Sequence, residues 1–310
     1  MTQRRLKEVL AILAMILVVI TAAELGFRAL VPHLSKNSRT LALAPERALR
    51  IAEAPPETTT VLILGNSVSD DGIIPDQLQT QLSGDGFDVL VEHQPADTSA
   101  MVDWSYQLEN HFLATGASPD LLVLPVGNPY PLTRINPQTE DLLFSFLRFS
   151  DLPEYVRLAE IEGFEERMTT YLGKLSSLYA FRGRLQKRAL STAFSGFPDL
   201  RLVMRAAQAP REAAVTPVWA ERLQRLSDEN GVTVIVVAMP TEPLDARLTH
   251  DDHVLCSRLG WEVLEPAAGA TFSATERPDG LHLTPDAASR FTEMLAIALH
   301  PALFARAGSL

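Results

Sequence analysis

Short apolar runs alternate with amphipathic helical patterns along most of the chain, and this alternation limits the possible folds more than any other feature. Five runs of mostly aliphatic residues predict strands, at Thr60–Leu64, Asp88–Glu92, Leu121–Val126, Val232–Ala238 and Trp261–Leu264. Continuous apolar runs of this length are typical of parallel strands that are covered on both faces. Strands that alternate with helices predict an α/β fold with a doubly wound sheet.

Helical patterns fill the gaps between these runs. They cover Pro75–Leu82, Met101–Leu113, Pro217–Asn230 and the residues after Thr284-Pro285. Asn230-Gly231 is a helix stop, and proline in the first turn is a helix start. The pattern therefore predicts a flavodoxin-like sheet of about five parallel strands with right-handed crossovers.

Residues 136–214 interrupt the alternation, because they contain no convincing strand pattern. We expect an inserted helical subdomain there, with a basic helix that includes Lys174, Arg182 and Arg184. A solvated basic face is the simplest interpretation of these charges. A lid over the site, or a surface that meets a membrane or a partner, remains open as an alternative.

The first 32 residues predict an N-terminal transmembrane helix. Arg4, Arg5 and Lys7 precede an uncharged apolar run, Val9–Ala23, and the helical pattern continues to Pro32. This favours an uncleaved signal anchor in the inner membrane, with the rest of the chain in the periplasm. A signal peptide cleaved after Ala23 is the alternative. Residues 33–58 are expected to be a linker and residues 59–310 the folded domain.

Composition excludes several classes of function. The net charge is −11, which argues against nucleic acid as a partner, since phosphate binding needs clustered cations. The single cysteine, Cys256, is expected to be a buried helix residue rather than a nucleophile. His250 and His253 have the spacing of a metal pair, but a solvated loop is the favoured interpretation. The sequence contains no cofactor motif, so we expect no cofactor.

Polar residues follow the predicted strands, at the sheet edge where ligands bind in doubly wound folds. Ser67 follows the first strand, and Asp279 and His282 precede the last helix. A serine hydroxyl becomes a strong nucleophile when a histidine removes its proton, and a carboxylate then holds the imidazole. Backbone N–H groups of Ser67 and Ala96 and the side chain of Asn128 are candidates for the oxyanion hole.

These motifs resemble the SGNH (GDSL-type) hydrolase superfamily over roughly Thr60–Leu299. The resemblance implies Ser67 as nucleophile, Asp279 and His282 as its partners in a Ser-His-Asp triad, and Asn128 as an oxyanion donor. The chain departs from the family pattern at three positions. Asn66 stands for an aspartate, Ala96 for a glycine that supplies an oxyanion N–H, and Pro129 for a second aspartate.

The resemblance implies a serine hydrolase, and three functions are open. The first is an extracytoplasmic esterase or deacetylase that acts on an acylated saccharide or another ester through an acyl-enzyme on Ser67. The second is an O-acyltransferase of a cell-envelope polysaccharide that works with a membrane-bound acyltransferase. The third is a non-catalytic envelope assembly factor. Fold and triad alone do not separate the first two, because both share the acylation step.

Overall fold

The computed structural model describes residues 3–34, 36–127, 132, 142–183, 185, 216–242 and 246–308. The chain forms two compact units. Residues 1–39 and 139–209 contribute to the first unit, and residues 40–138 and 210–310 contribute to the second.

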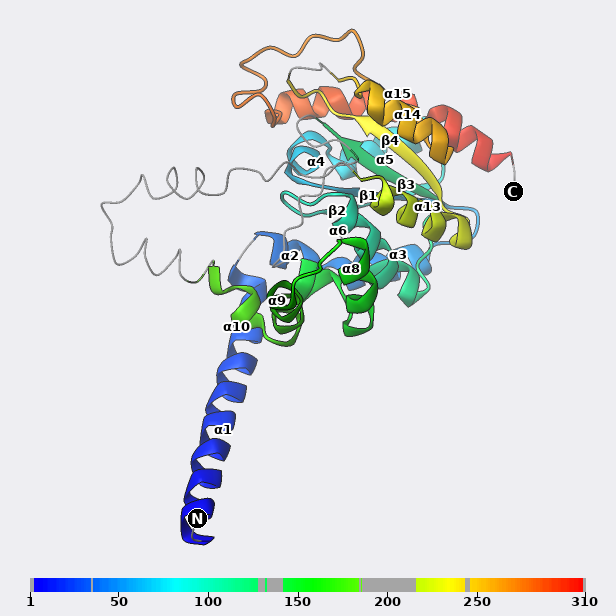
Figure 1. Ribbon diagram of the computed structural model, residues 1–310. Helices are drawn as coiled ribbons and strands as arrows, with labels where there is room; N and C mark the ends of the chain where they lie inside the picture. Colours follow the sequence, from blue (N-terminus) through cyan, green and yellow to red (C-terminus); the bar gives the residue numbers. More distant parts are fainter. Residues whose placement is uncertain are drawn as a thin grey trace. The chain divides into compact units, whose positions relative to one another are not determined.

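The second unit is built on a five-stranded parallel sheet with the order β2-β1-β3-β4-β5 (Figure 1). The strands are β1 (Thr59–Gly65), β2 (Val89–Pro95), β3 (Leu121–Val126), β4 (Thr233–Ala238) and β5 (Glu262–Leu264). All neighbouring strands are parallel. The predicted α/β class, the flavodoxin-like order and the positions of the strands are therefore confirmed.

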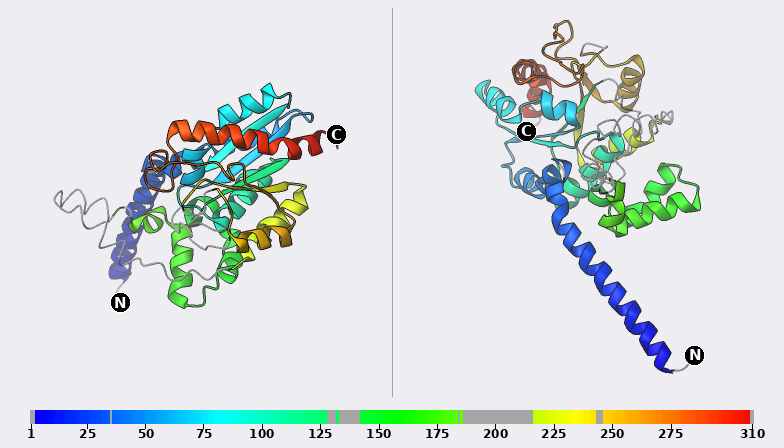
Figure 2. Two further views of the ribbon diagram at one scale, coloured as in Figure 1. Left: turned by 90° about the horizontal axis from the view of Figure 1, so that it is seen from above. Right: turned by 90° about the vertical axis from the view of Figure 1, so that its left-hand side faces the viewer.

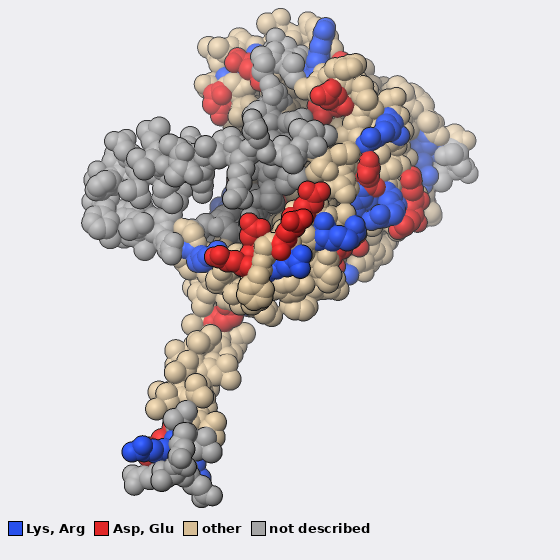
Figure 3. Space-filling view, in the orientation of Figure 1, with Lys and Arg blue, Asp and Glu red and all other residues tan. Residues whose placement is uncertain are grey.

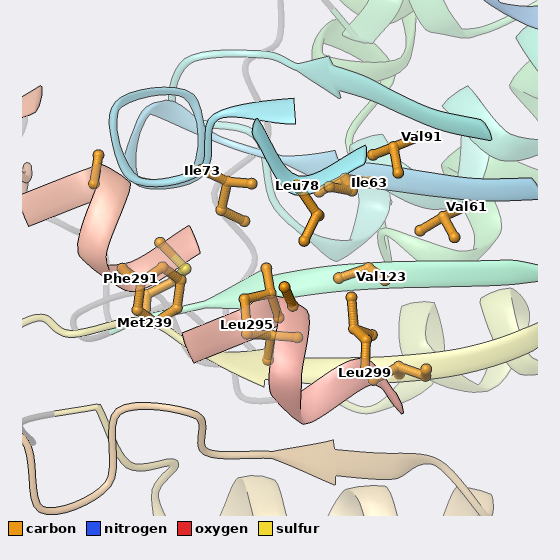
Figure 4. Packing of buried hydrophobic residues seen from close by; sticks show 14 of the residues in the cluster. Val61, Ile63, Ile73, Leu78, Val91, Val123, Met239, Phe291, Leu295 and Leu299 are labelled. Atoms are coloured by element: carbon orange, nitrogen blue, oxygen red, sulfur yellow. The ribbon is translucent and has the colours of Figure 1, made fainter. Parts of the chain in front are cut away.

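Helices cover both faces of this sheet (Figure 2). They include α3 (Ala44–Ala52), α5 (Pro75–Gly84), α6 (Met101–Gln107), α13 (Val218–Asn230), α14 (His250–Leu259) and α15 (Pro285–Ala307). Because side chains alternate along a strand, Val61 and Ile63 point to one face and Leu62 and Leu64 to the other. Val61 and Ile63 pack with residues of α5 and α15 in the main core cluster, which includes Leu295 (Figure 4).

The helix predicted over Met101–Leu113 changes type partway along. It is α-helical to Gln107, continues as a π-helical turn, η1 (Leu108–Phe112), and ends in a 3₁₀ turn, η2 (Leu113–Thr115). Gly116 then closes the segment with a φ of +84°, a conformation that glycine adopts without steric cost.

The stretch expected to be a linker instead forms two helices, α2 (Lys36–Ala42) and α3. Helix α3 is amphipathic and buries Ala44, Ala48 and Ile51. Its polar side binds the edge strand β2, where the Arg50 guanidinium forms two hydrogen bonds with the Glu92 carboxylate, one of them 2.9 Å long. The prediction was wrong because the Arg50–Glu92 ion pair joins residues that are 42 positions apart in the sequence.

The first unit is helical in its described part. Its elements are α1 (Gln3–Leu34), η3 (Leu142–Phe146), η4 (Phe149–Asp151), α8 (Leu152–Leu158), α9 (Phe164–Leu175) and α10 (Ser177–Ala180). Phe27 and Val31 of α1 pack with Ala180 and Phe181 in a small apolar cluster. Within 142–183 the structure contains helices and turns and no strand, while the rest of the insertion expected over 136–214 lies outside the described residues.

Helix α1 contains a 22-residue segment, Leu10–Val31, that is long and apolar enough to cross a membrane. Its mean hydropathy is 2.5, and little of its surface is buried within the protein. Figure 3 shows this helix as a mostly uncharged rod with charged side chains towards its ends. A signal sequence can have the same length and composition as this segment, so these two properties do not distinguish an anchor from a signal sequence.

Candidate active site

Ser67 lies where β1 gives way to the short helix α4 (Ser67–Gly72). Asn66 is the N-cap of this helix: its side-chain oxygen accepts a hydrogen bond from the Val68 N–H at 3.0 Å. Strand β1 lies between β2 and β3 in the sheet, next to the point where the strand order reverses. Ligands of doubly wound sheets bind at this point, beyond the carboxyl ends of the strands.

A buried polar pair, Ser69 and His93, contacts the turn that carries Ser67. The Ser69 hydroxyl donates to the Asn66 carbonyl at 2.8 Å and lies 3.1 Å from Nε2 of His93, at the carboxyl end of β2. A Cβ atom on Gly65 would lie 2.0 Å from the Ser69 hydroxyl oxygen, so only glycine fits there. Sequence reasoning had assigned no role to His93, because nothing in its neighbourhood along the chain indicates this contact.

Burial dominates the protonation of this histidine. The His93 ring is enclosed, and burial lowers its pKa from 6.5 to about 4, with Arg47 acting in the same direction and Asp70 in the opposite one. His93 is therefore neutral at physiological pH. A neutral ring can exchange a hydrogen bond with the Ser69 hydroxyl without placing a charge behind the nucleophile.

The three residues predicted to form the triad meet in space. Nε2 of His282 lies 2.9 Å from Oγ of Ser67, although 215 residues separate them in sequence. Nδ1 of the same ring lies 2.6 Å from Oδ2 of Asp279. Both distances are within hydrogen-bonding range, and the base contacts the nucleophile with one nitrogen and its carboxylate partner with the other.

The Asp279 carboxylate fixes the tautomer of the imidazole. Its Oδ1 accepts the backbone N–H groups of His282, at 2.8 Å, and Leu281, at 3.0 Å. The His282 N–H, then the His282 ring and the Leu281 N–H, lower the pKa of Asp279 from 3.8 to about 2. An ionised carboxylate only accepts hydrogen bonds, so Nδ1 must carry the proton. The lone pair of Nε2 then faces the Ser67 hydroxyl, as a general base requires.

The loop that carries Asp279 and His282 is tied to the sheet. Gly280 has a φ of +78°, which lets the chain turn back so that the carboxylate reaches the ring three residues later. Its carbonyl accepts the N–H of Glu242, which follows β4, at 3.0 Å. The buried Arg277 guanidinium donates to the Phe272 carbonyl at 2.7 Å. These contacts hold the base in place before substrate binds.

The loop after β2 is also tied to the nucleophile strand, and this changes the expectation for Ala96. The Ala96 N–H donates to the Gly65 carbonyl at 2.9 Å, so it continues the β1–β2 ladder. The Ser99 hydroxyl donates to the same carbonyl at 2.9 Å and accepts from the Trp104 indole at 2.8 Å. In this conformation the Ala96 N–H is therefore bonded to the Gly65 carbonyl and, contrary to the expectation from the sequence, does not point to an oxyanion.

Of the other predicted oxyanion donors, Asn128 lies outside the described residues. The Ser67 N–H lies in the first turn of α4, where backbone N–H groups have no intrahelical acceptor. Thr98, two residues after Ala96, has a φ of +60°, which is strained for a β-branched residue. The loop that follows β2 thus stores strain beside the nucleophile.

The remaining candidates lie apart from the triad. His250 and His253 begin α14 rather than a loop before it, and the His253 ring lies 3.0 Å from the Glu265 carboxylate. Among the residues that the structure describes, no three histidine, cysteine or acidic side chains gather as a metal site. Cys256 is buried in α14 as predicted, and burial raises the pKa of its thiol to about 12.

Comparison with known proteins gives matches among solved structures only. No protein-family model and no curated protein match the chain. Similar solved structures include TesA (12% identity, 78% of this chain and 99% of that one, TM-score 0.39). They also include a putative lipolytic protein of the G-D-S-L family from Desulfitobacterium hafniense (10%, 78% and 99%, TM-score 0.40) and a variant of an acetyl xylan esterase from Geobacillus stearothermophilus (11%, 79% and 94%, TM-score 0.40). The case for this chain's chemistry rests on the distances within its own triad.

Proposed function

We propose that the protein is a membrane-anchored serine esterase that removes O-acyl groups outside the cytoplasm. The observation that carries this proposal is the continuous chain of contacts from Asp279 through His282 to the Ser67 hydroxyl. Such a chain activates a serine for attack on an ester carbonyl.

The reaction has two halves. As the Ser67 oxygen attacks the ester carbon, Nε2 of His282 takes the hydroxyl proton and the carbonyl oxygen becomes an oxyanion. Collapse of this intermediate breaks the bond to the alcohol, which leaves with the proton from His282. Water then attacks the acyl-enzyme, His282 takes its proton, and the acid departs as Ser67 regains its own.

Exposure of the triad favours water as the acceptor. The His282 side chain is 31% exposed and that of Asp279 is 53% exposed. Closing a site protects a reactive intermediate from water, so a base that is open to solvent is more readily reached by water than one in a closed site. This openness is the reason for preferring hydrolysis to transfer.

The proposed location rests on α1. Arg5 and Lys7 precede the apolar segment Leu10–Val31, and basic residues on this side favour a cytoplasmic amino terminus. The catalytic unit would then lie on the opposite side of the membrane.

A serine-directed fluorophosphonate probe tests the nucleophile on the full chain in detergent. The wild type should be labelled, and Ser67→Ala and His282→Ala should not. Ser83→Ala, which changes an exposed serine of α5, is the matched control and should keep full labelling. Folded wild type that resists the probe would favour the non-catalytic assembly factor.

Ester hydrolysis with and without a glycan acceptor separates the two enzymatic functions. An esterase releases free acid at the same rate whether or not the acceptor is present. Acylated glycan that forms at the expense of free acid would replace the esterase proposal with an O-acyltransferase.

A further inference from the structure

Helix α9 of the first unit has an unusual distribution of side chains. Its buried residues are the small ones, Thr170 and Gly173. Gly173 packs so closely on Leu143 that a Cβ atom there would lie 3.0 Å from its nearest methyl group. Its large apolar residues are exposed instead: Phe164 (81%), Met168 (43%), Leu172 (38%) and Leu175 (57%).

These four residues, here called the α9 stripe, share one face of the helix. Their spacings of four, four and three residues place them within about 80° of one another at roughly 100° per residue. Phe149, also exposed, packs edge-on against Tyr171 beside the stripe with ring centroids 6.0 Å apart. A contiguous exposed apolar surface of this kind marks an interaction site.

The C-terminal end of the stripe is fixed to the anchor helix. Arg28 of α1 donates to the Leu175 carbonyl at 2.8 Å. One turn earlier, the Glu24 carboxylate accepts the Ser177 N–H at 2.7 Å and the Ser176 hydroxyl at 2.8 Å, so that α10 lies against α1 (Figure 1). Glu24 and Arg28 also pair with each other at 2.7 Å. The stripe therefore begins at the level of α1 where its uncharged segment ends.

The length of that uncharged segment indicates what covers the stripe. Val9–Ala23 contains 15 residues. At 1.5 Å per residue it spans about 22 Å, short of the ~30 Å hydrocarbon core of a bilayer. The remainder of a span comes from the end of the segment Leu10–Val31, where Leu25 and Leu30 of α1 are exposed. The α9 stripe is further apolar surface at the same level.

We propose that α9 lies at the membrane–water interface on the extracytoplasmic side, with the α9 stripe facing the lipid. The helix would then hold the helical unit against the bilayer. This inference rests on the proposed membrane anchor. The occupant of the stripe is the lipid surface itself, because the contact of Arg28 with the Leu175 carbonyl holds the C-terminal end of the stripe against the apolar segment Leu10–Val31 of α1. The paired Glu24 and Arg28 charges are stabilised at this depth by each other and by α10.

Fluorescence of the full chain in phosphatidylcholine nanodiscs, one chain per disc, tests this proposal. Leu172→Cys and Phe164→Cys each place an NBD label on the stripe. Glu166→Cys, exposed and about 200° around the helix from Phe164, is the matched control. Cys256 can stay, because its buried thiol with a pKa of about 12 is unreactive.

Labels on the stripe should be quenched by spin-labelled lipid, by roughly twofold or more beyond the control, because interfacial helices bury their apolar face about 5–10 Å deep. They should also be protected from aqueous iodide. Stripe labels as open to iodide as the control would overturn the proposal, and would leave a protein partner as the occupant. Fluorophosphonate labelling of Ser67 in the same discs reports on the proposed function independently.

Discussion

The buried His93 ring should make the stability of the catalytic unit depend on pH in a calculable way. Its folded-state pKa of about 4 lies below the ordinary 6.5, so the folded protein binds fewer protons than the unfolded chain between these values. The free energy of unfolding therefore falls as pH falls through this window. Above pH 6.5 the protein keeps all of the stability that is lost when His93 is protonated on unfolding. From about pH 8 to about pH 5 the expected loss is about 2 kcal/mol, and by about pH 4 it approaches 3 kcal/mol.

Urea unfolding in detergent, followed by tryptophan fluorescence, measures this loss. Trp104, Trp219 and Trp261 are the three tryptophans of the chain, and all lie in the second unit. The comparison is between wild type and His93→Gln, whose amide can still reach the Ser69 hydroxyl but does not titrate. Other groups contribute equally to both proteins, so the wild type should lose about 2 kcal/mol more than the variant between about pH 8 and about pH 5. Equal losses would refute the assignment of a neutral, buried His93.

Three further predictions concern the site. Asp279→Asn should lower ester hydrolysis by about 10⁴-fold in a folded protein, because the amide no longer imposes the required imidazole tautomer; unchanged turnover would show that the carboxylate only shapes the loop. Gly65→Ala should cost about 1–3 kcal/mol in urea unfolding, since the new Cβ would lie 2.0 Å from the Ser69 hydroxyl, while Gly84→Ala, with no atom within 4 Å, should change little. Initial rates on a soluble ester should rise with pH because a general base acts in its unprotonated form, and a flat profile between about pH 5 and 8 would count against a histidine base.

The strands and the triad could be predicted from the sequence because their patterns are local. Each strand is a short apolar run between turn residues, and Ser67 follows one directly. Asp279 and His282 are three residues apart, so the turn between them brings carboxylate and ring together. Strand order then places both ends of the triad at one edge of the sheet.

The missed features depend on contacts across the fold. Helix α3 looked like a linker because its docking uses Arg50 and Glu92, which are 42 residues apart. The Ser69–His93 pair forms because β1 and β2 lie side by side, which no short motif encodes. The Ala96 N–H donates to the Gly65 carbonyl because of the backbone conformation after β2. The sequence shows only that alanine has an N–H group, not which acceptor it faces.

The 215-residue separation of Ser67 and His282 also governs when activity arises during synthesis. The nucleophile turn emerges early, but its base precedes the last helix, α15, and reaches Ser67 only when that helix packs on the finished sheet. Closing so long a loop is a late, non-local event in folding. A chain interrupted before residue 282 would carry a serine without its base, so the proposed ester cleavage would report that the unit has been completed.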